Sequence, residues 1–290
     1  MLVKEIDFLK LLEGLRNGFF NKFFEFVTIL GEETIIILLV TIIYYMFSKK
    51  EAKRLFFIVI ATTGVNTIAK NLVKRPRPFA NGEITAIRQE TATGYSFPSG
   101  HSQNIATLGT YLALRVRKIW VIIAVSLVCL LVGFSRLYLG VHYPSDVIVG
   151  LLLGVGVSIG GTILYDKVNN KNLLMFIILL IITPFMVIFM FNANPLAANF
   201  YKMYGMLSGF LVGSIFEENV VKYDISGPIW KKILRVVITI GCVFAVKEGF
   251  KLLYKGAGVE VSLIMDSIRY FLIIFVGLGL CPLLFKKIKL

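Results

Sequence analysis

The stretch Ser135-Arg136-Leu-Tyr-Leu-Gly-Val-His142-Tyr-Pro-Ser145-Asp146 places three ionisable side chains between two long apolar runs. Ionisable groups inside membrane segments are rare and mark functional sites. Asp146 follows His142 by four residues, so a helix that begins near Ser145 lets the carboxylate reach the imidazole. A carboxylate on one ring nitrogen raises the basicity of the other, as a nucleophile or general base requires. Arg136 offers a planar cation for an oxyanion beside that histidine.

Two further stretches place polar groups next to apolar runs. The other histidine of the chain, His101, ends the segment Phe97-Pro-Ser-Gly-His101, immediately before an apolar run. A basic segment, Lys70-Asn-Leu-Val-Lys-Arg-Pro-Arg77-Pro78, follows an earlier apolar run. In chain order the three stretches have the forms K-x6-R-P, P-S-G-H and S-R-x5-H-x3-D.

Together these three signatures resemble the type 2 phosphatidic acid phosphatase (PAP2) superfamily, which includes membrane lipid phosphatases, glucose-6-phosphatase and the soluble vanadium haloperoxidases. They cover residues 70–146, about a quarter of the chain, and no signature position departs from the pattern. The matching positions are Lys70, Arg77, Pro78, Pro98, Ser99, Gly100, His101, Ser135, Arg136, His142 and Asp146.

The resemblance implies a catalytic role for three residues. His142 would attack phosphorus and form a phosphohistidine, and Asp146 would orient it and stabilise its positive imidazole. His101 would protonate the leaving oxygen and then activate the water that cleaves the phosphoenzyme. Such a mechanism combines covalent and acid–base catalysis.

The remaining site residues have the chemistry of a phosphate-binding site. Lys70, Arg77 and Arg136 supply cations to a group that bears up to about two negative charges, and guanidinium groups can bind two oxygens at once. Ser99 and Gly100 precede a predicted helix, whose free amides and dipole favour an anion. No carboxylate cluster in the sequence suits a divalent metal, so neither a metal nor another cofactor is expected.

These residues also have structural interpretations that involve no catalysis. Taken singly, His101 would be a helix cap or interfacial residue, and each signature cation would be a residue that extends to the membrane surface. Their joint order favours the phosphate site. Lys74, Arg75 and Arg88 match no signature position and are interpreted as solvated loop charges, with contact to a lipid headgroup as the alternative.

Composition predicts an all-α, polytopic transmembrane bundle. Of the 290 residues 57% are hydrophobic, and the mean hydropathy is +0.80, whereas soluble domains have about 45–50% apolar residues. Several apolar runs approach the length of about 20 residues that spans a bilayer. We expect about nine spans, over residues 23–47, 55–73, 101–114, 119–134, 147–164, 173–191, 203–216, 233–250 and 264–285.

The chain divides by pattern into three parts. Residues 1–22 mix apolar and charged side chains, as in an amphipathic helix that lies in the membrane interface. Residues 23–170 form the PAP2-like catalytic core, in which residues 74–97 are expected to cap the site or to carry a short interfacial helix. Residues 171–290 add transmembrane helices of unknown role.

Glycines recur at four-residue spacing on two predicted helices. Gly150 and Gly154 form one pair, and Gly205, Gly209 and Gly213 form a series. Such spacing lets helix backbones approach closely within a membrane. It predicts tight helix packing, with homo-oligomerisation through these faces as a further possibility.

The charge pattern predicts membrane partners and an orientation. The net charge is +14, but the basic residues lie mainly at helix ends, which fits membrane anchoring better than nucleic-acid binding. With nine spans, the three signatures share one side and the opposite side collects more Lys and Arg. The positive-inside rule then places the chain in the plasma membrane with its site facing the extracytoplasmic side.

The leading functional hypothesis is a metal-independent membrane phosphatase that acts on a lipid phosphate or diphosphate. Polyprenyl diphosphates such as undecaprenyl diphosphate, phosphatidic acid and phosphatidylglycerol phosphate all fit. One alternative is a sugar-phosphate phosphatase similar to glucose-6-phosphatase, and another is a non-catalytic phosphate-binding transporter or scaffold. His101, His142 and Asp146 argue against the non-catalytic alternative, because binding needs neither a nucleophile nor a leaving-group acid.

Overall fold

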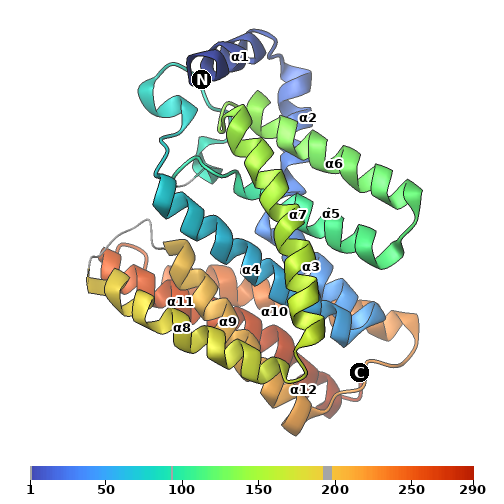
Figure 1. Cartoon of the computed structure of the whole chain (residues 1–290). Coiled ribbons are helices and arrows are strands. Elements are labelled where there is room, and N and C mark those ends of the chain that lie inside the picture. The colour runs from blue at the N-terminus through green and yellow to red at the C-terminus, as the bar shows by residue number, and fades with distance from the viewer. Residues whose placement is uncertain (1, 93, 192–197) are drawn as a thin grey trace. The chain divides into compact units, whose positions relative to one another are not determined.

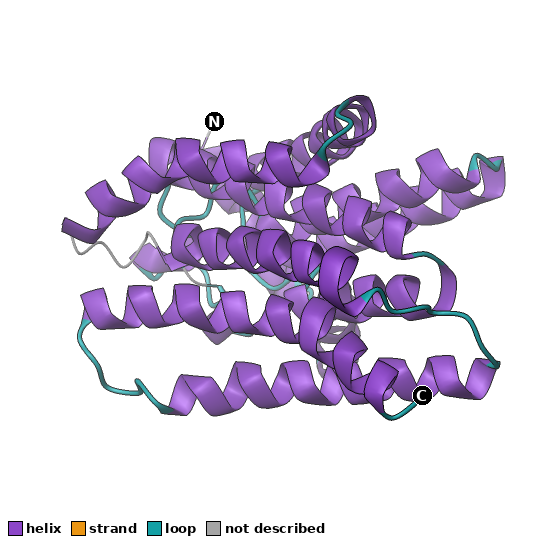
Figure 2. Ribbon diagram, turned by 90° about the horizontal axis from the view of Figure 1, so that it is seen from below, coloured by secondary structure: helices purple, strands orange, loops and turns teal. Residues whose placement is uncertain are grey.

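The computed structural model describes residues 2–92, 94–191 and 198–290. All regular elements in these ranges are helical, without a strand, which confirms the predicted all-α class (Figure 2). The α-helices are α1 (Leu2–Gly14), α2 (Gly18–Ile29), α3 (Glu33–Ile42), α4 (Lys49–Val73), α5 (Gly100–Val116), α6 (Ile119–Tyr138), α7 (Pro144–Lys167), α8 (Lys171–Phe191), α9 (Ala198–Phe216), α10 (Ile229–Leu252), α11 (Val259–Phe275) and α12 (Cys281–Lys287), shown in Figure 1.

Among the described residues, five short turns have other helical geometries. Two are 3-10 turns, η2 (Pro78–Asn81) and η3 (Gln89–Thr91), and both lie in the segment between α4 and α5. Three are π-helical turns, η1 (Ile43–Phe47), η5 (Glu217–Val221) and η6 (Val276–Leu280), and each directly follows an α-helix.

The chain is an integral membrane protein, but the predicted count of nine spans is not confirmed. Each predicted span lies on helical residues, with the first broken at residues 30–32. Within the described ranges, a sixth helix long and apolar enough to cross a membrane appears only if Gly18–Ile29 and Glu33–Phe47 are counted as one broken span. The other five are Lys49–Val73, Ile119–Tyr138, Pro144–Lys167, Lys171–Ile188 and Val259–Lys287.

The chain forms two compact units. The first contains residues 1–36 and 61–163, and the second contains residues 37–60 and 164–290. All the residues of the three sequence signatures belong to the first unit. The interfacial position of the amino-terminal helix and the three-part division stay predictions.

Within the first unit, two glycines let α7 approach α5 closely. A β-carbon on Gly150 would lie 2.6 Å from the Ser99 carbonyl oxygen, and one on Gly154 would lie 2.4 Å from the Gln103 carbonyl oxygen. The helix-packing interpretation of this glycine pair is therefore confirmed. The contact matters for the site because α5 begins at Gly100 and α7 carries Asp146.

Within the second unit, the glycine series of α9 packs against α11 and η6. A β-carbon on Gly205 would lie 2.1 Å from the Ser267 carbonyl oxygen, and one on Gly209 would lie 2.6 Å from the Phe271 carbonyl oxygen. Gly213 continues the same face toward Leu278. These glycines serve packing inside one chain, while homo-oligomerisation stays a prediction.

We expect Gly154→Ala to lower the free energy of unfolding by about 1–3 kcal/mol, because the added methyl group overpacks the α5–α7 contact. Thermal unfolding in detergent, followed by intrinsic fluorescence, measures the change. Gly156→Ala is the matched control, since a β-carbon there has no neighbour within 4 Å. Equal melting temperatures for the two variants would show that the contact is looser than described.

Candidate active site

The segment between α6 and α7 holds His142 in a tight turn. α6 ends at Tyr138 and α7 begins at Pro144, so a short connection of residues 139–143 joins them. Gly140 has φ +72°, and a β-carbon there would lie 2.8 Å from Ile84. A glycine at this position permits both the backbone conformation and the close approach, which fixes the path of the chain just before the histidine.

His142 and Asp146 form the pair that their spacing predicted. The histidine Nδ1 lies 3.3 Å from the Asp146 Oδ2, and the two side chains are 2% and 0% exposed. The same carboxylate oxygen accepts hydrogen bonds from the Tyr143 backbone N–H at 2.9 Å and from the Ser96 hydroxyl. The Ser96 hydroxyl also lies 3.4 Å from His142 Nδ1. These contacts fix the imidazole ring in one orientation.

Arg77 contacts the opposite nitrogen of the same ring. Its Nη1 lies 3.1 Å from His142 Nε2 and donates to the Val141 carbonyl at 3.0 Å, and its Nε donates to the Gly94 carbonyl at 3.0 Å. Burial lowers the pKa of Arg77 to about 10, so the guanidinium is still protonated at neutral pH. A guanidinium can only donate. His142 Nε2 is therefore the acceptor, and the ring proton lies on Nδ1, toward Asp146.

Electrostatics keep this imidazole neutral. Burial, followed by the positive charges of Arg77 and Lys70, holds the pKa of His142 well below its usual value. A neutral ring with its proton on Nδ1 has a free electron pair on Nε2. This is the form that a histidine nucleophile needs.

The other two signature cations are also buried. Lys70 donates to the carbonyls of Tyr95 and Ser96, the latter at 3.5 Å. Arg136 is 1% exposed, and its Nη1 donates to the Thr28 hydroxyl at 2.6 Å. Its Nε is buried and has no hydrogen-bond partner in the described part of the chain. A buried donor of this kind is costly unless a ligand satisfies it.

The start of α5 differs in one respect from the sequence prediction. The Ser99 amide is not free for an anion, because it donates to the Asp146 carbonyl at 3.0 Å. The Ser99 hydroxyl caps the helix by accepting from the Ser102 amide at 3.4 Å. Ser99 therefore locks α5 to α7, and Gly100, the first residue of the helix, is the remaining candidate from this pair for an amide contact with phosphate.

His101 lies in the first turn of α5. Its Nε2 is buried without a hydrogen-bond partner among the residues that the structure describes. The break between α2 and α3 makes room for it, since a β-carbon on Gly31 would lie 2.9 Å from His101 Cβ. Asn104 donates to the Gly31 carbonyl at 3.2 Å and holds the break in place.

The prediction that Arg88 is a solvated loop charge is wrong. Arg88 Nη2 pairs with Glu32 Oε1 at 3.1 Å, and Nη1 donates to the Glu25 carbonyl at 3.3 Å. Glu32 and Glu33 interrupt the apolar run of residues 23–47. The ion pair with Arg88 balances the charge of Glu32 there. A sequence pattern could not match Glu32 with Arg88 because they are 56 positions apart.

Arg75 was also predicted to be a solvated loop charge, and this too is wrong. Its Nη1 lies 2.8 Å from Asp146 Oδ1 and 2.6 Å from the Ser145 hydroxyl, and its guanidinium stacks 3.8 Å from the centre of the Tyr143 ring. Its Nη2 lies 2.6 Å from Glu5 Oε2 on α1. Arg75 thus pairs with Asp146 Oδ1, whereas His142 contacts Oδ2.

A signal for Arg75 was present in the sequence. In Arg75-Pro76-Arg77-Pro78 each proline favours an extended conformation for the arginine before it, and residues two apart on an extended chain point to the same face. Arg75 could therefore have been assigned to the face of Arg77. Glu5 gave no such signal, because 70 residues separate it from Arg75. Ser96 was also missed. Its hydroxyl donates to Asp146, which lies 50 residues later in the sequence.

Comparison with known proteins connects both parts of the chain to one family. The profile described as "PAP2 superfamily" matches residues 51–172. A second profile, described as "PAP2 superfamily phosphatase, transmembrane extension", matches residues 201–290.

Curated relatives resemble about a third of the chain. An undecaprenyl-diphosphatase of Sulfolobus acidocaldarius is 38% identical over 91 residues, which are 31% of this chain and 44% of the relative. Phosphatidylglycerophosphatase B of Bacillus subtilis is 35% identical over 100 residues, 31% of this chain and 46% of the relative. The chain thus spans about half the length of the curated relatives it matches.

A solved structure resembles the fold. The crystal structure of a transmembrane PAP2 type phosphatidylglycerolphosphate phosphatase from Bacillus subtilis has a TM-score of 0.50 at 24% sequence identity. The match covers 59% of this chain and 88% of that one. At this level of identity the likeness concerns the fold alone.

We expect His142 to stay neutral at about pH 6, where an ordinary histidine with a pKa near 6.5 is mostly protonated. The chain has two histidines, so NMR of protein labelled with 15N-histidine can resolve both rings, and His101→Gln assigns them. The spectrum should show the proton of neutral His142 on Nδ1. A protonation midpoint at or above the ordinary value, or a proton on Nε2, would contradict the described geometry.

We expect Arg75→Gln to raise the pKa of His142, because the negative charge of Asp146 then loses the cation that balances it. The same NMR titration measures the shift, and thermal unfolding checks that the variant folds. Lys74→Gln is the matched control, since it removes a neighbouring exposed cation. If both variants titrate like the unmodified protein, Arg75 does not control the charge of the His142–Asp146 pair.

Proposed function

This chain belongs to the PAP2 superfamily, and from that premise we propose that it is a metal-independent membrane phosphatase that hydrolyses lipid phosphates or diphosphates through a phosphohistidine. The observation that carries the proposal is the state of His142: a buried neutral imidazole with its proton directed at Asp146 and its free electron pair directed at Arg77. A structural histidine needs no such arrangement, whereas a nucleophile does.

In the proposed first step, His142 Nε2 forms a bond to phosphorus as the bond from phosphorus to the leaving oxygen breaks. Arg77 exchanges its contact with Nε2 for a phosphate oxygen, and Lys70 and Arg136 neutralise the other oxygens. The unpartnered Arg136 Nε is a donor available for this purpose. Asp146 stabilises the positive charge that develops on the ring.

In the proposed second step, water replaces the histidine. In the first step a protonated His101 gives its proton to the leaving oxygen as that oxygen departs. In the second step the neutral ring takes a proton from the attacking water, as the phosphorus–nitrogen bond breaks and phosphate is released. Its unpartnered Nε2 is available for both transfers.

The described residues include no group of three or more His, Cys, Asp or Glu that could hold a metal ion. In the proposed mechanism, the cations of the site supply the positive charge that a metal would otherwise supply.

Three observations support a lipid substrate. The protein is embedded in a membrane, and its relatives are named for undecaprenyl diphosphate, phosphatidylglycerophosphate and other lipid phosphates. Hydrolysis at the end of a membrane helix suits a substrate whose phosphate lies at the bilayer surface and whose chains stay in the lipid. We therefore place polyprenyl diphosphates, phosphatidic acid and phosphatidylglycerol phosphate ahead of soluble sugar phosphates.

We further propose that the protein lies in the plasma membrane with its site on the extracytoplasmic side. Individual helices carry site residues at one end and other basic residues at the opposite end. α5 has His101 in its first turn and Arg115 in its last turn, with Arg117 just after it, whereas α6 follows Lys118 and has Arg136 in its last turn. The positive-inside rule assigns the end with the additional basic residues to the cytoplasm.

Phosphate release from purified protein in detergent with EDTA tests the proposal. The substrates are undecaprenyl diphosphate, phosphatidic acid, phosphatidylglycerol phosphate and glucose 6-phosphate. We expect release from at least one lipid, and we expect His142→Ala to reduce it about a thousandfold or more, because the nucleophile is lost. Lys74→Gln, which changes a cation outside the site, should keep its activity.

Each other outcome has a definite meaning. Release from glucose 6-phosphate alone would move the assignment to a sugar-phosphate phosphatase. No release by a folded protein would favour the transporter or scaffold. Inactivation by EDTA would contradict metal independence, and an active, folded His142→Ala variant would contradict the phosphohistidine mechanism.

A further inference from the structure

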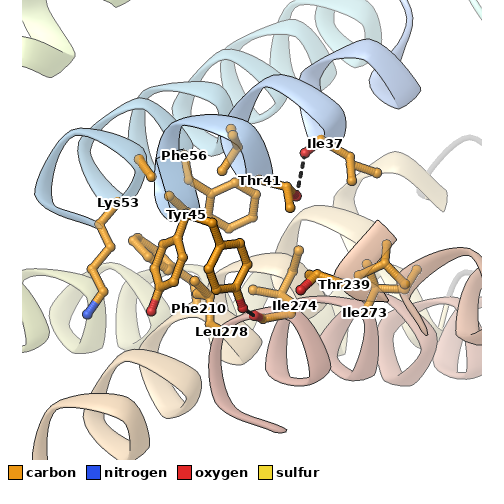
Figure 3. A pocket seen from close by; sticks show the side chains of 15 residues that line it. Ile37, Thr41, Tyr45, Lys53, Phe56, Phe210, Thr239, Ile273, Ile274 and Leu278 are labelled. Carbon is orange, nitrogen blue, oxygen red and sulfur yellow. Dashed lines mark hydrogen bonds between the residues drawn. The ribbon is translucent and has the colours of Figure 1, made fainter. Parts of the chain in front are cut away.

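The second unit contains a pocket to which none of the signature residues contributes. Fifteen residues of α3, η1, α4, α9, α10, α11 and η6 line it (Figure 3). Its volume is about 50 Å³. That volume exceeds the roughly 10–15 Å³ that one water needs, and it is well below the roughly 150 Å³ of a cavity that accepts benzene. The size admits a hydroxyl group and the first carbons of one narrow chain, and it excludes a ring system.

Two π-helical turns supply part of the wall. Tyr44 and Tyr45 lie on η1, and Gly277 and Leu278 lie on η6. The third π-helical turn, η5, carries Glu217, which contacts the pocket residue Lys53. π-Helical turns are rare and occur frequently at functional sites. All three π-helical turns of the described residues are thus at or next to one pocket.

The pocket offers no unpaired charge. Lys53 is the lining residue with a formal charge, and its ammonium lies 2.9 Å from Glu218 Oε1 and 3.4 Å from Glu217 Oε2. Glu217 is also paired with Lys49 at 2.5 Å. An anionic or cationic ligand would have to compete with these pairs in a buried setting. The pocket therefore favours an uncharged molecule.

Two hydroxyls on lining residues, those of Tyr44 and Thr239, lack a hydrogen-bond partner within the described residues. The Tyr44 side chain is 2% exposed, and its hydroxyl has no hydrogen-bond partner within the described residues. Neighbouring hydroxyls are engaged: Thr41 donates to the Ile37 carbonyl at 2.7 Å and Tyr45 donates to the Gly277 carbonyl at 3.4 Å (Figure 3). A buried hydroxyl without a partner costs about 1–3 kcal/mol. A ligand oxygen would remove that cost.

We propose that this pocket binds a long-chain alcohol, with the hydroxyl of the ligand bonded to Tyr44 and the start of its hydrocarbon chain among the apolar side chains. The uncharged head satisfies the Tyr44 hydroxyl without disturbing the Lys53 pairs, and the volume admits that head and the first carbons of a single chain. The proposal rests on the geometry of the second unit and is independent of the proposed phosphatase activity.

Photolabelling of the full-length protein in detergent tests the proposal. The probe is a sixteen-carbon alcohol with a diazirine in its chain and a terminal alkyne for detection. We expect saturable labelling of peptides that contain residues 37–45 or 273–278. Unlabelled hexadecanol should compete strongly, while hexadecylamine, which is charged, and hexadecane, which has no oxygen, should compete weakly.

Two variants separate the polar and apolar parts of the site. Tyr44→Phe should weaken competition by hexadecanol about three- to tenfold, the value of one hydrogen bond. Tyr204→Phe is its matched control in the same unit, because the Tyr204 hydroxyl already lies 3.2 Å from the Thr183 hydroxyl. Gly277→Leu should block labelling by filling the pocket, since a β-carbon there would lie 3.6 Å from Val243 and 3.9 Å from Thr239, two residues of the wall.

Gly277→Ala, whose methyl group makes ordinary contacts, should fold and should reduce labelling partly. Labelling that does not saturate, or that is unchanged in both Gly277 variants, would overturn the proposed site. Equal competition by hexadecane and hexadecanol, with Tyr44→Phe unchanged, would overturn the recognition of a hydroxyl. Stronger competition by the amine would contradict the uncharged class.

Discussion

The first unit depends on the satisfaction of one buried carboxylate. Asp146 is fully buried, and both of its oxygens have partners: Arg75 on one side, and His142, Ser96 and the Tyr143 amide on the other. A buried charge with these partners is tolerated, whereas the same charge with one partner removed destabilises a protein strongly. The same requirement brings the segment after α4, the connection after α6 and the start of α7 to one point. The architecture of the site and its chemistry therefore have one physical origin.

Sequence reasoning found the residues whose partners are close along the chain or belong to a signature. His142 and Asp146 are four residues apart, and a helix start brings them together. Arg75 and Arg88 were missed because the partners of each lie far away in sequence, and a loop cation looks solvated until its partner is known. The predicted free amide of Ser99 failed for a similar reason, since its acceptor is the carbonyl of a residue on another helix.

The helical class followed from hydropathy, but hydropathy could not give the number of spans. The first predicted span is broken at residues 30–32, where a glycine lies against His101. α5 has 17 residues, so it is short for a span of about 20. The π-helical turns of the second unit were also invisible, because an additional residue in a helical turn leaves no mark in an apolar run. The missing hydrogen-bond partner of the Tyr44 hydroxyl could not be predicted either, because a tyrosine in an apolar run is interpreted as a packing residue.

The contact of α1 with the site has a consequence for how the reactivity of the histidine can change. Glu5 binds both Arg75 and the Ser145 amide, so a helix outside every signature sets part of the charge balance around Asp146. An altered residue on that helix, or a surface that draws it away, changes the field at the imidazole while every signature residue stays in place. Part of the charge balance around the imidazole therefore comes from an amino-terminal helix that no signature includes.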